Sequence, residues 1–159
     1  MTDENFYKSL GLPPIDQIGF VVRDIEAWIA RYDALFGPFS RMDGSVQAVD
    51  YRGSKEDVKL ALAFGRSGAL EIEFIEWQSG RSPHREFIEL GREGMHHVRF
   101  RVDNCDAWIE KMKTVGFQPI WYKVWSEDTV FTYMERENDP TLIEFLQMPE
   151  ASYNNATQQ

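Results

Sequence analysis

The stretch 96-HHVRFRVDNCDAWI-109 decides the fold, because the chain carries the same phrase once before, as 16-DQIGFVVRDIEAWI-29. Aligned without a gap, each residue of the later copy lies 80 positions after its counterpart, so that Gln17 matches His97. Both copies read as a strand with alternating apolar residues, followed by a helix. The repeat therefore predicts one core built from two similar units.

The composition is that of a globular protein and excludes several classes. Hydrophobic residues make up 43% of the 159 residues and aromatic residues 14%. The net charge of −9 argues against nucleic acid or an anionic membrane as partner. The apolar runs fall short of a membrane span, and the N-terminus does not read as a secretory signal. A single cysteine, Cys105, excludes an intrachain disulfide framework. We expect a soluble, cytoplasmic protein.

The order strand, helix, strand, strand, strand occurs in both halves. In the first half, Gly37-Pro38 ends the helix and strand-like stretches follow around 39–51, 58–64 and 70–77. In the second half, Gly116 ends the helix and strands are expected at 117–125, 129–135 and 141–147. The sequence thus predicts a leader (1–14), a first βαβββ module (15–77), a linker with a short helix (78–93), a second module (94–147) and a disordered tail (148–159).

Strand periodicity directs four polar side chains toward one concave surface. In the first strand of each module the apolar alternate residues should pack on the helix, which turns Gln17 and His97 the other way. The last strands, 72-IEFI-75 and 143-IEFL-146, place Glu73 and Glu144 opposite their own apolar residues in the same manner. Two open sheets packed side by side, with their helices outside, would bring all four into a shared cleft.

These four residues offer one amide oxygen, one imidazole and two carboxylates. Such a set suits a single divalent ion that accepts nitrogen and oxygen ligands, and two carboxylates balance its charge. Zinc, nickel, cobalt, manganese and iron are all candidates. The alternative is that the four are unrelated polar residues on exposed strand faces.

The paired modules resemble the vicinal oxygen chelate superfamily, which includes glyoxalase I, methylmalonyl-CoA epimerase, extradiol dioxygenases and antibiotic-resistance proteins. The motifs that carry the resemblance are 16-DQIGFVV-22, 72-IEFI-75, 95-MHHVRFRV-102 and 142-LIEFLQ-147. The resemblance implies an α+β fold of two tandem βαβββ modules forming a curved mixed sheet around a metal-binding cleft. It also places Gln17, Glu73, His97 and Glu144 at the metal positions.

The resemblance implies a metal-dependent isomerase, epimerase or glyoxalase-type lyase. In this superfamily the metal acts as a Lewis acid that stabilises an enolate next to a carbonyl, while a nearby carboxylate moves the proton. Glu144 and Glu73 are the candidate bases, and the analogy with glyoxalase I favours Glu144. One alternative is an extradiol ring-cleaving dioxygenase using iron(II). Iron is less expected than zinc, cobalt, nickel or manganese, because such enzymes normally use two histidines and one carboxylate, and Gln17 stands where one histidine is expected. The other alternative is a metal-free binding or resistance protein.

Candidate substrate-binding residues are Arg99, Trp121, Trp125 and Tyr133. Arg99 shares the cleft face with His97 and is equally well explained by substrate contact or by pairing with Glu71. The aromatic residues could line a pocket for an acyl or aromatic group, or could belong to the core. The substrate expected is a small carbonyl compound, such as a thioester or an aromatic compound, and a homodimer is compatible with the resemblance.

The remaining histidines are expected to play no part in the site. His96 neighbours His97 but should point to the opposite face of a regular strand, as a surface or core-edge residue. His84 belongs to the linker.

Overall fold

The computed structural model describes residues 10–149, so the predicted tail beyond 149 and most of the predicted leader lie outside the described residues. The first half contains β1 (Gln17–Val22), α2 (Ile25–Phe36), β2 (Ser40–Asp43), β3 (Val46–Tyr51), β4 (Ser54–Ser67) and β5 (Leu70–Ser79). Then follow α3 (Pro83–Glu89), β6 (Gly94–Arg101), α4 (Cys105–Lys113), β7 (Phe117–Val124), β8 (Val130–Arg136) and β9 (Leu142–Gln147). No helix within these residues is long and apolar enough to cross a membrane.

In this part of the chain, nine strands form one strongly curved sheet in the order β2-β4-β3-β7-β8-β9-β6-β1-β5. An additional pairing of β4 with β5 closes the sheet on itself, which leaves β2 as an appendage on β4. The two halves meet along β1 with β6 and along β3 with β7, both antiparallel. The predicted α+β fold of two repeated units around a curved mixed sheet is confirmed.

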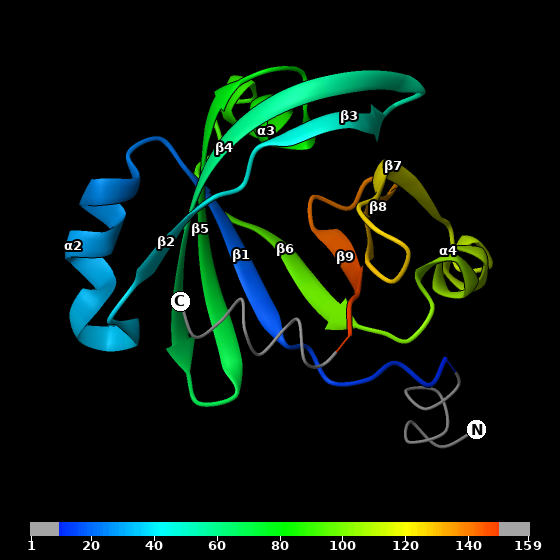
Figure 1. The fold of residues 1–159 in the computed structure, drawn as a ribbon, viewed down its shortest axis with the longest axis horizontal. Coiled ribbons are helices and arrows are strands. Elements are labelled where there is room, and N and C mark those ends of the chain that lie inside the picture. The colour runs from blue at the N-terminus through cyan, green and yellow to red at the C-terminus, as the bar shows by residue number, and fades with distance from the viewer. Residues whose placement is uncertain (1–9, 150–159) are drawn as a thin grey trace.

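Each long helix begins where the sequence places its cap. Oδ1 of Asp24 accepts a hydrogen bond from the Ala27 N–H at 3.1 Å, and Oδ1 of Asn104 accepts one from the Ala107 N–H at 3.0 Å. These bonds satisfy backbone donors that the first turn of a helix leaves free. Because both copies start their helix at the same step, α2 and α4 occupy equivalent positions outside the sheet (Figure 1).

The repeated tryptophans anchor the two helices to the sheet. Trp28 of α2 packs its ring edge-on against Phe74, with centroids 5.5 Å apart. Trp108 of α4 stacks on Phe145, with centroids 5.7 Å apart. Phe74 and Phe145 are 1% and 0% exposed, and the full burial of such a side chain stabilises the fold by about 1.5–3 kcal/mol. The helices thus cover the outside of the sheet, and its inner face remains for the site.

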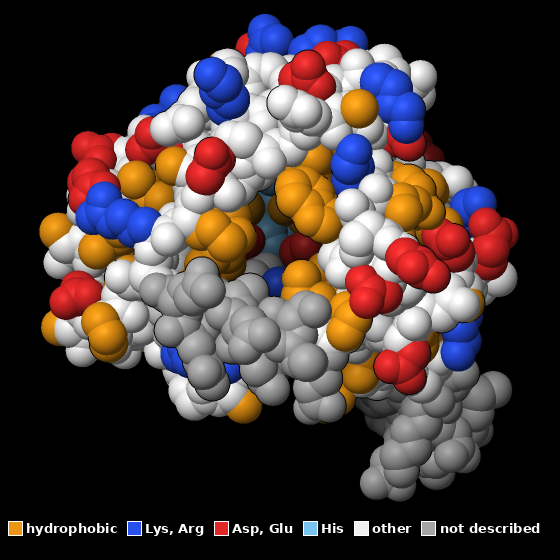
Figure 2. Space-filling model, viewed as in Figure 1, with side chains coloured by type: hydrophobic (Ala, Val, Ile, Leu, Met, Phe, Trp, Pro, Cys, Tyr) orange, Lys and Arg blue, Asp and Glu red, His pale blue; other side chains and the backbone are white. Residues whose placement is uncertain are grey.

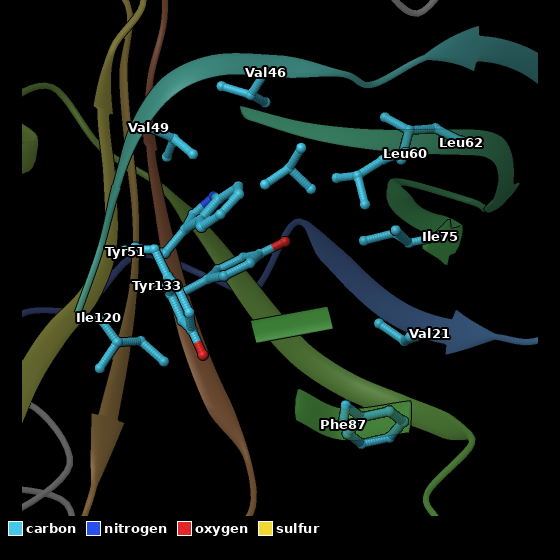
Figure 3. Close-up of a cluster of buried hydrophobic side chains, with 12 residues drawn as sticks. Val21, Val46, Val49, Tyr51, Leu60, Leu62, Ile75, Phe87, Ile120 and Tyr133 are labelled. Carbon is cyan, nitrogen blue, oxygen red and sulfur yellow. The ribbon is translucent and has the colours of Figure 1, made fainter. Parts of the chain in front are cut away.

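A separate hydrophobic cluster fills part of the inside of the curve (Figure 3). Its members come from both halves of the chain and include Val21, Ile75, Tyr51, Trp121 and Tyr133. The side chains approach one another from facing strands, which joins the two halves through apolar contact as well as through their edges.

The first half has one strand more than predicted, because the stretch 39–51 divides into β2 and β3. The division falls at 43-DGS-45, where Oδ1 of Asp43 accepts a hydrogen bond from the Ser45 N–H at 2.9 Å. Such a local bond between a side chain and the backbone two residues later makes a turn. Both short strands then pair with the long β4.

Candidate metal centre

Four neighbouring strands, in the order β9-β6-β1-β5, supply the candidate site. Gly19 of β1 lies beside His97 of β6 and Glu73 of β5. Arg99 of β6 lies beside Glu144 of β9. Paired residues in a sheet point to the same face, and so do alternate residues of one strand. The four predicted polar side chains therefore share the inner face.

The structure brings all four side chains together at one atom, Nε2 of His97. This nitrogen lies 3.1 Å from Oε1 of Gln17, 3.0 Å from Oε2 of Glu144 and 3.4 Å from Oε1 of Glu73. Three oxygen atoms from three other strands thus surround one imidazole nitrogen. In the sequence these residues are separated by as many as 127 positions, from Gln17 to Glu144.

Burial divides the four side chains into two pairs. Gln17 and His97 are completely buried, whereas the side chains of Glu73 and Glu144 are 10% and 13% exposed. Figure 2 shows a hollow near the centre of one face, with acidic, basic and histidine side chains at its bottom and hydrophobic side chains around its rim. The two carboxylates are therefore the members of the set that a small molecule could reach.

A buried carboxylate fixes which end of the Gln17 amide faces the centre. Nε2 of Gln17 donates a hydrogen bond of 2.7 Å to Oε1 of Glu71, so Oε1 of Gln17 is the atom turned toward His97. Glu71 is 3% exposed, and burial raises its pKa although Arg99 and the Gln17 bond act in the opposite direction. The Gln17 amide thus turns its oxygen, the amide atom that is able to bind a metal ion, toward the site.

Arg99 is held by two acidic residues of the protein. Its Nε and Nη2 each donate a hydrogen bond of 3.0 Å to the carboxylate of Asp16, and Nη2 lies 3.5 Å from Oε1 of Glu71. The side chain is only 7% exposed. Of the two interpretations of Arg99, these contacts favour structural pairing. The sequence pointed to Glu71 and missed Asp16, the stronger partner, which lies just before the first strand.

The expectation for His96 was wrong. Its side chain is 2% exposed, and its Nδ1 lies 3.0 Å from Nδ1 of His97. The pairing of β1 with β6 explains this, because the partner of Gly19 is His97 whereas the partner of Phe20 is Met95. His96 is therefore the extra residue of a β-bulge, which places two successive side chains on one side of the strand.

His84 also reaches the interior. It is 1% exposed, its ring stacks on that of His96 with centroids 5.4 Å apart, and its Nε2 lies 3.1 Å from the Tyr133 hydroxyl. The helix α3, which carries His84 in its first turn, folds back against this part of the sheet. Neither burial nor position could be foreseen from a linker sequence without periodicity.

The three aromatic residues proposed for the substrate lie in different surroundings. Trp121 and Tyr133 are 3% and 5% exposed and stack on each other in the inner hydrophobic cluster. The ring of Tyr133 also lies 4.9 Å from that of His97, which puts it at the edge of the site. Trp125 follows β7 and is 58% exposed. Of these three aromatic residues, Tyr133 is thus the one with a ring contact to His97.

The set fits a divalent ion in its donor types and in the distances from Nε2. Burial opposes a charge on His97, but Glu144 and Glu73 outweigh it and raise the pKa of this histidine to about 9. A metal ion would meet the same negative surroundings. Ligands about 2.1 Å from an ion lie about 3.0 Å apart in an octahedron and about 3.4 Å apart in a tetrahedron.

The described side chains, in their present positions, do not form a complete metal-binding site. Among residues 10–149, no group of three or more His, Cys, Asp or Glu is arranged so that it could hold a metal ion as it stands. The candidate set has three such residues and takes its fourth donor from Gln17. The two carboxylates would have to turn toward a common point to complete it.

A family model matches most of the chain. Residues 16–133 match the Glyoxalase/Bleomycin resistance/Dioxygenase superfamily. Among curated proteins, the uncharacterized protein YqjC of Bacillus subtilis is 26% identical over 106 residues, which cover 67% of each chain.

Solved structures share the fold. A hypothetical protein from Bacillus halodurans has a TM-score of 0.60 at 23% identity, over 86% of this chain and 95% of that one. A variant of methylmalonyl-CoA epimerase from Streptomyces coelicolor, in complex with 2-nitronate-propionyl-CoA, has a TM-score of 0.62 at 20% identity, over 87% and 96%. The Mycobacterium tuberculosis methylmalonyl-CoA epimerase has a TM-score of 0.59 at 15% identity, over 90% and 93%. At these identities the likeness establishes the fold alone.

Proposed function

The chain belongs to the Glyoxalase/Bleomycin resistance/Dioxygenase superfamily, and on this basis we propose that it is a divalent-metal-dependent enzyme that moves a proton next to a carbonyl group. The reaction is redox-neutral and takes the form of an isomerisation, an epimerisation or a glyoxalase-type lyase reaction. The substrate is a small carbonyl compound. A thioester is the first class to test, because structures of similar fold are described with coenzyme A compounds bound.

The observation that carries this proposal is the convergence of three oxygen atoms, from three other strands, on Nε2 of His97. Burying two carboxylates beside each other is costly unless a positive charge compensates them. In the metal-free protein the His97 imidazolium can supply that charge. A divalent ion held by Gln17, Glu73, His97 and Glu144 would supply more of it.

When bound, such an ion acts as a Lewis acid that lowers the energy of an enolate formed beside a carbonyl group. The chain itself supplies the acceptor of the proton. Glu73 and Glu144 are the partly exposed members of the set, whereas Gln17 and His97 are inaccessible. We therefore assign the base to one of the two carboxylates.

The proposed proton transfer is redox-neutral and needs no oxidant, reductant or second substrate. The carboxylate takes the proton from the carbon next to the carbonyl, and the electron pair of the C–H bond forms the enolate. The same proton, or one exchanged with solvent, then returns to carbon. Return to the opposite face gives the epimer, and return to a neighbouring carbon gives the isomer.

The experiment is proton exchange measured by NMR in D₂O. Chelator-treated protein is reloaded with zinc, cobalt, nickel or manganese and incubated with acyl-CoA thioesters, including methylmalonyl-CoA. We expect the loss of the α-proton signal with at least one metal. Glu144→Gln or Glu73→Gln, whichever is the base, should slow exchange by about 100-fold or more, whereas the exposed Glu127→Gln should not.

Two outcomes would contradict the proposal. Exchange that is equally fast in chelator-treated protein and in both carboxylate variants would place the chemistry elsewhere. Oxygen consumption with a catechol in the iron(II)-loaded protein, without exchange on any thioester, would favour the dioxygenase alternative.

A further inference from the structure

We propose that His96 is a positioning residue that fixes the direction and the tautomer of His97. In this role His96 would make Nε2 of His97 available to a metal ion, and this part of the inference rests on the proposed function. The hydrogen-bond arrangement itself belongs to the metal-free fold and can be tested there.

The backbone makes the contact between these successive residues possible. In a regular strand their side chains would lie on opposite faces of the sheet. The bulge in β6 opposite Gly19 and Phe20 removes this alternation, and the two rings stand almost perpendicular with centroids 5.3 Å apart. A feature that re-aims one side chain at the edge of a site is a common use of a bulge.

The hydrogen bonds of His96 leave one choice of tautomer. Besides the contact of its Nδ1 with Nδ1 of His97, His96 bonds to the backbone of Pro83. Proline has no N–H, so the Pro83 group is the carbonyl oxygen, which can only accept. Since Nδ1 of His96 is already engaged with His97, the ring nitrogen left to donate to this oxygen is Nε2, which must then carry the proton, and Nδ1 of a neutral His96 is an acceptor.

The tautomer of His97 follows from that of His96. Because Nδ1 of His96 accepts, Nδ1 of His97 must donate. The proton that His97 gives up on binding a metal ion is then the one on Nε2, and the lone pair is left on that nitrogen. This is the nitrogen that lies 3.0–3.4 Å from the Gln17, Glu144 and Glu73 oxygens. A hydrogen bond from the far nitrogen is how proteins commonly fix and orient a ligating histidine.

Packing holds the His96 ring in place. Phe87 meets it edge-on at 5.1 Å, His84 stacks on it at 5.4 Å, and Tyr133 lies against it at 5.6 Å between ring centroids. These contacts hold the ring of His96 rigidly, as an orienting acceptor requires.

The first test is NMR of the metal-free wild-type protein with ¹⁵N-labelled histidine. Couplings between ring protons and ring nitrogens report which nitrogen of each histidine is protonated, and the His96→Phe spectrum assigns the signals. We expect His96 with a protonated Nε2 and an unprotonated Nδ1. A protonated Nδ1 on His96 would overturn the proposal whether or not the protein binds a metal.

The second test compares zinc affinity in two folded variants by competition with a chromogenic chelator. His96→Phe keeps an aromatic ring without an acceptor, and we expect binding about 10- to 100-fold weaker. His96→Asn offers an amide oxygen near the position of Nδ1 and should recover most of that loss. Wild-type zinc affinity in His96→Phe would overturn the positioning role and leave the proposed function standing. If the wild type takes up no metal, the proposed function fails and the NMR result still decides the hydrogen-bond arrangement.

Discussion

The ring of His97 lies directly over Gly19, its partner on the neighbouring strand. A Cβ atom added to Gly19 would overlap this ring, at 2.6 Å from Nδ1. The imidazole therefore occupies the space that a side chain on β1 would take. In the other repeat the equivalent position is Arg99, whose side chain turns to Asp16.

We predict that Gly19→Ala displaces His97 and weakens zinc binding by at least about tenfold. The added methyl group and the ring cannot share the space, so one of them must move. Isothermal titration of the folded variant, as judged by circular dichroism, measures the effect. An unchanged affinity would mean that the position of His97 over Gly19 does not matter for the site.

Glu71 should contribute to stability through the amide of Gln17. In Glu71→Ala the Gln17 Nε2 group and the guanidinium of Arg99 lose a buried acceptor, and an unsatisfied buried donor costs about 1–3 kcal/mol. We expect the free energy of unfolding in urea to fall by about that amount. The matched control is Glu127→Ala, at an exposed position, which should be nearly neutral. Equal stability of the two variants would contradict the orienting role of Glu71.

The buried His84 should make the fold sensitive to acid. Burial, together with the charge of His97, lowers the pKa of His84 from 6.5 to about 3. Below pH 6.5 the unfolded chain therefore binds a proton that the folded chain does not, so stability is present in full above pH 6.5 and is lost as the pH falls toward 3.

The slope should approach about 1.4 kcal/mol per pH unit for this one group. His84 packs against His96, Tyr133 and Trp121, of which His96 also has a lowered pKa. The measurement is urea unfolding between pH 7 and pH 4 for the wild type and for His84→Gln. We expect a shallower dependence in the variant, and the same slope in both proteins would show that His84 titrates normally.

Cys105 should be inert in the folded protein. It is fully buried at the start of α4, and burial, with the charges of Asp106 and Glu144, raises its pKa to about 12. Since the thiolate is the reactive form, iodoacetamide at pH 8 should modify the unfolded chain and spare the folded one. Rapid stoichiometric labelling of native protein would contradict the described packing.

Much of the fold follows from the sequence because two local signals specify it, the alternation of apolar residues along a strand and the capping residue of the following helix. Both signals occur twice in the chain. The alternation of Ile18, Phe20 and Val22 sets one face of β1, and the cap at Asp24 starts α2. The division of 39–51 into two strands was missed because a three-residue turn interrupts an otherwise extended stretch. Periodicity reports which face a residue takes, and it does not report where a strand changes partner.

Strand alternation also decides which side chains of the site could be placed from the sequence. Alternation was enough to place Gln17, Glu73 and Glu144 on one face, because β1, β5 and β9 keep their register there. It misplaced His96 because a bulge in β6 breaks the alternation. The available signal was Gly94, two residues before His96, because a glycine inside a strand often marks a bulge nearby.

The measurement that tests the central claim most directly is metal stoichiometry. Chelator-treated protein is dialysed against zinc, cobalt, nickel or manganese and analysed for bound metal, beside His97→Ala and Glu144→Ala. We predict about one equivalent of at least one of these ions in the wild type, and its loss in both variants while circular dichroism shows that they remain folded. Absence of uptake in the wild type, or equal uptake in all three proteins, would contradict the account.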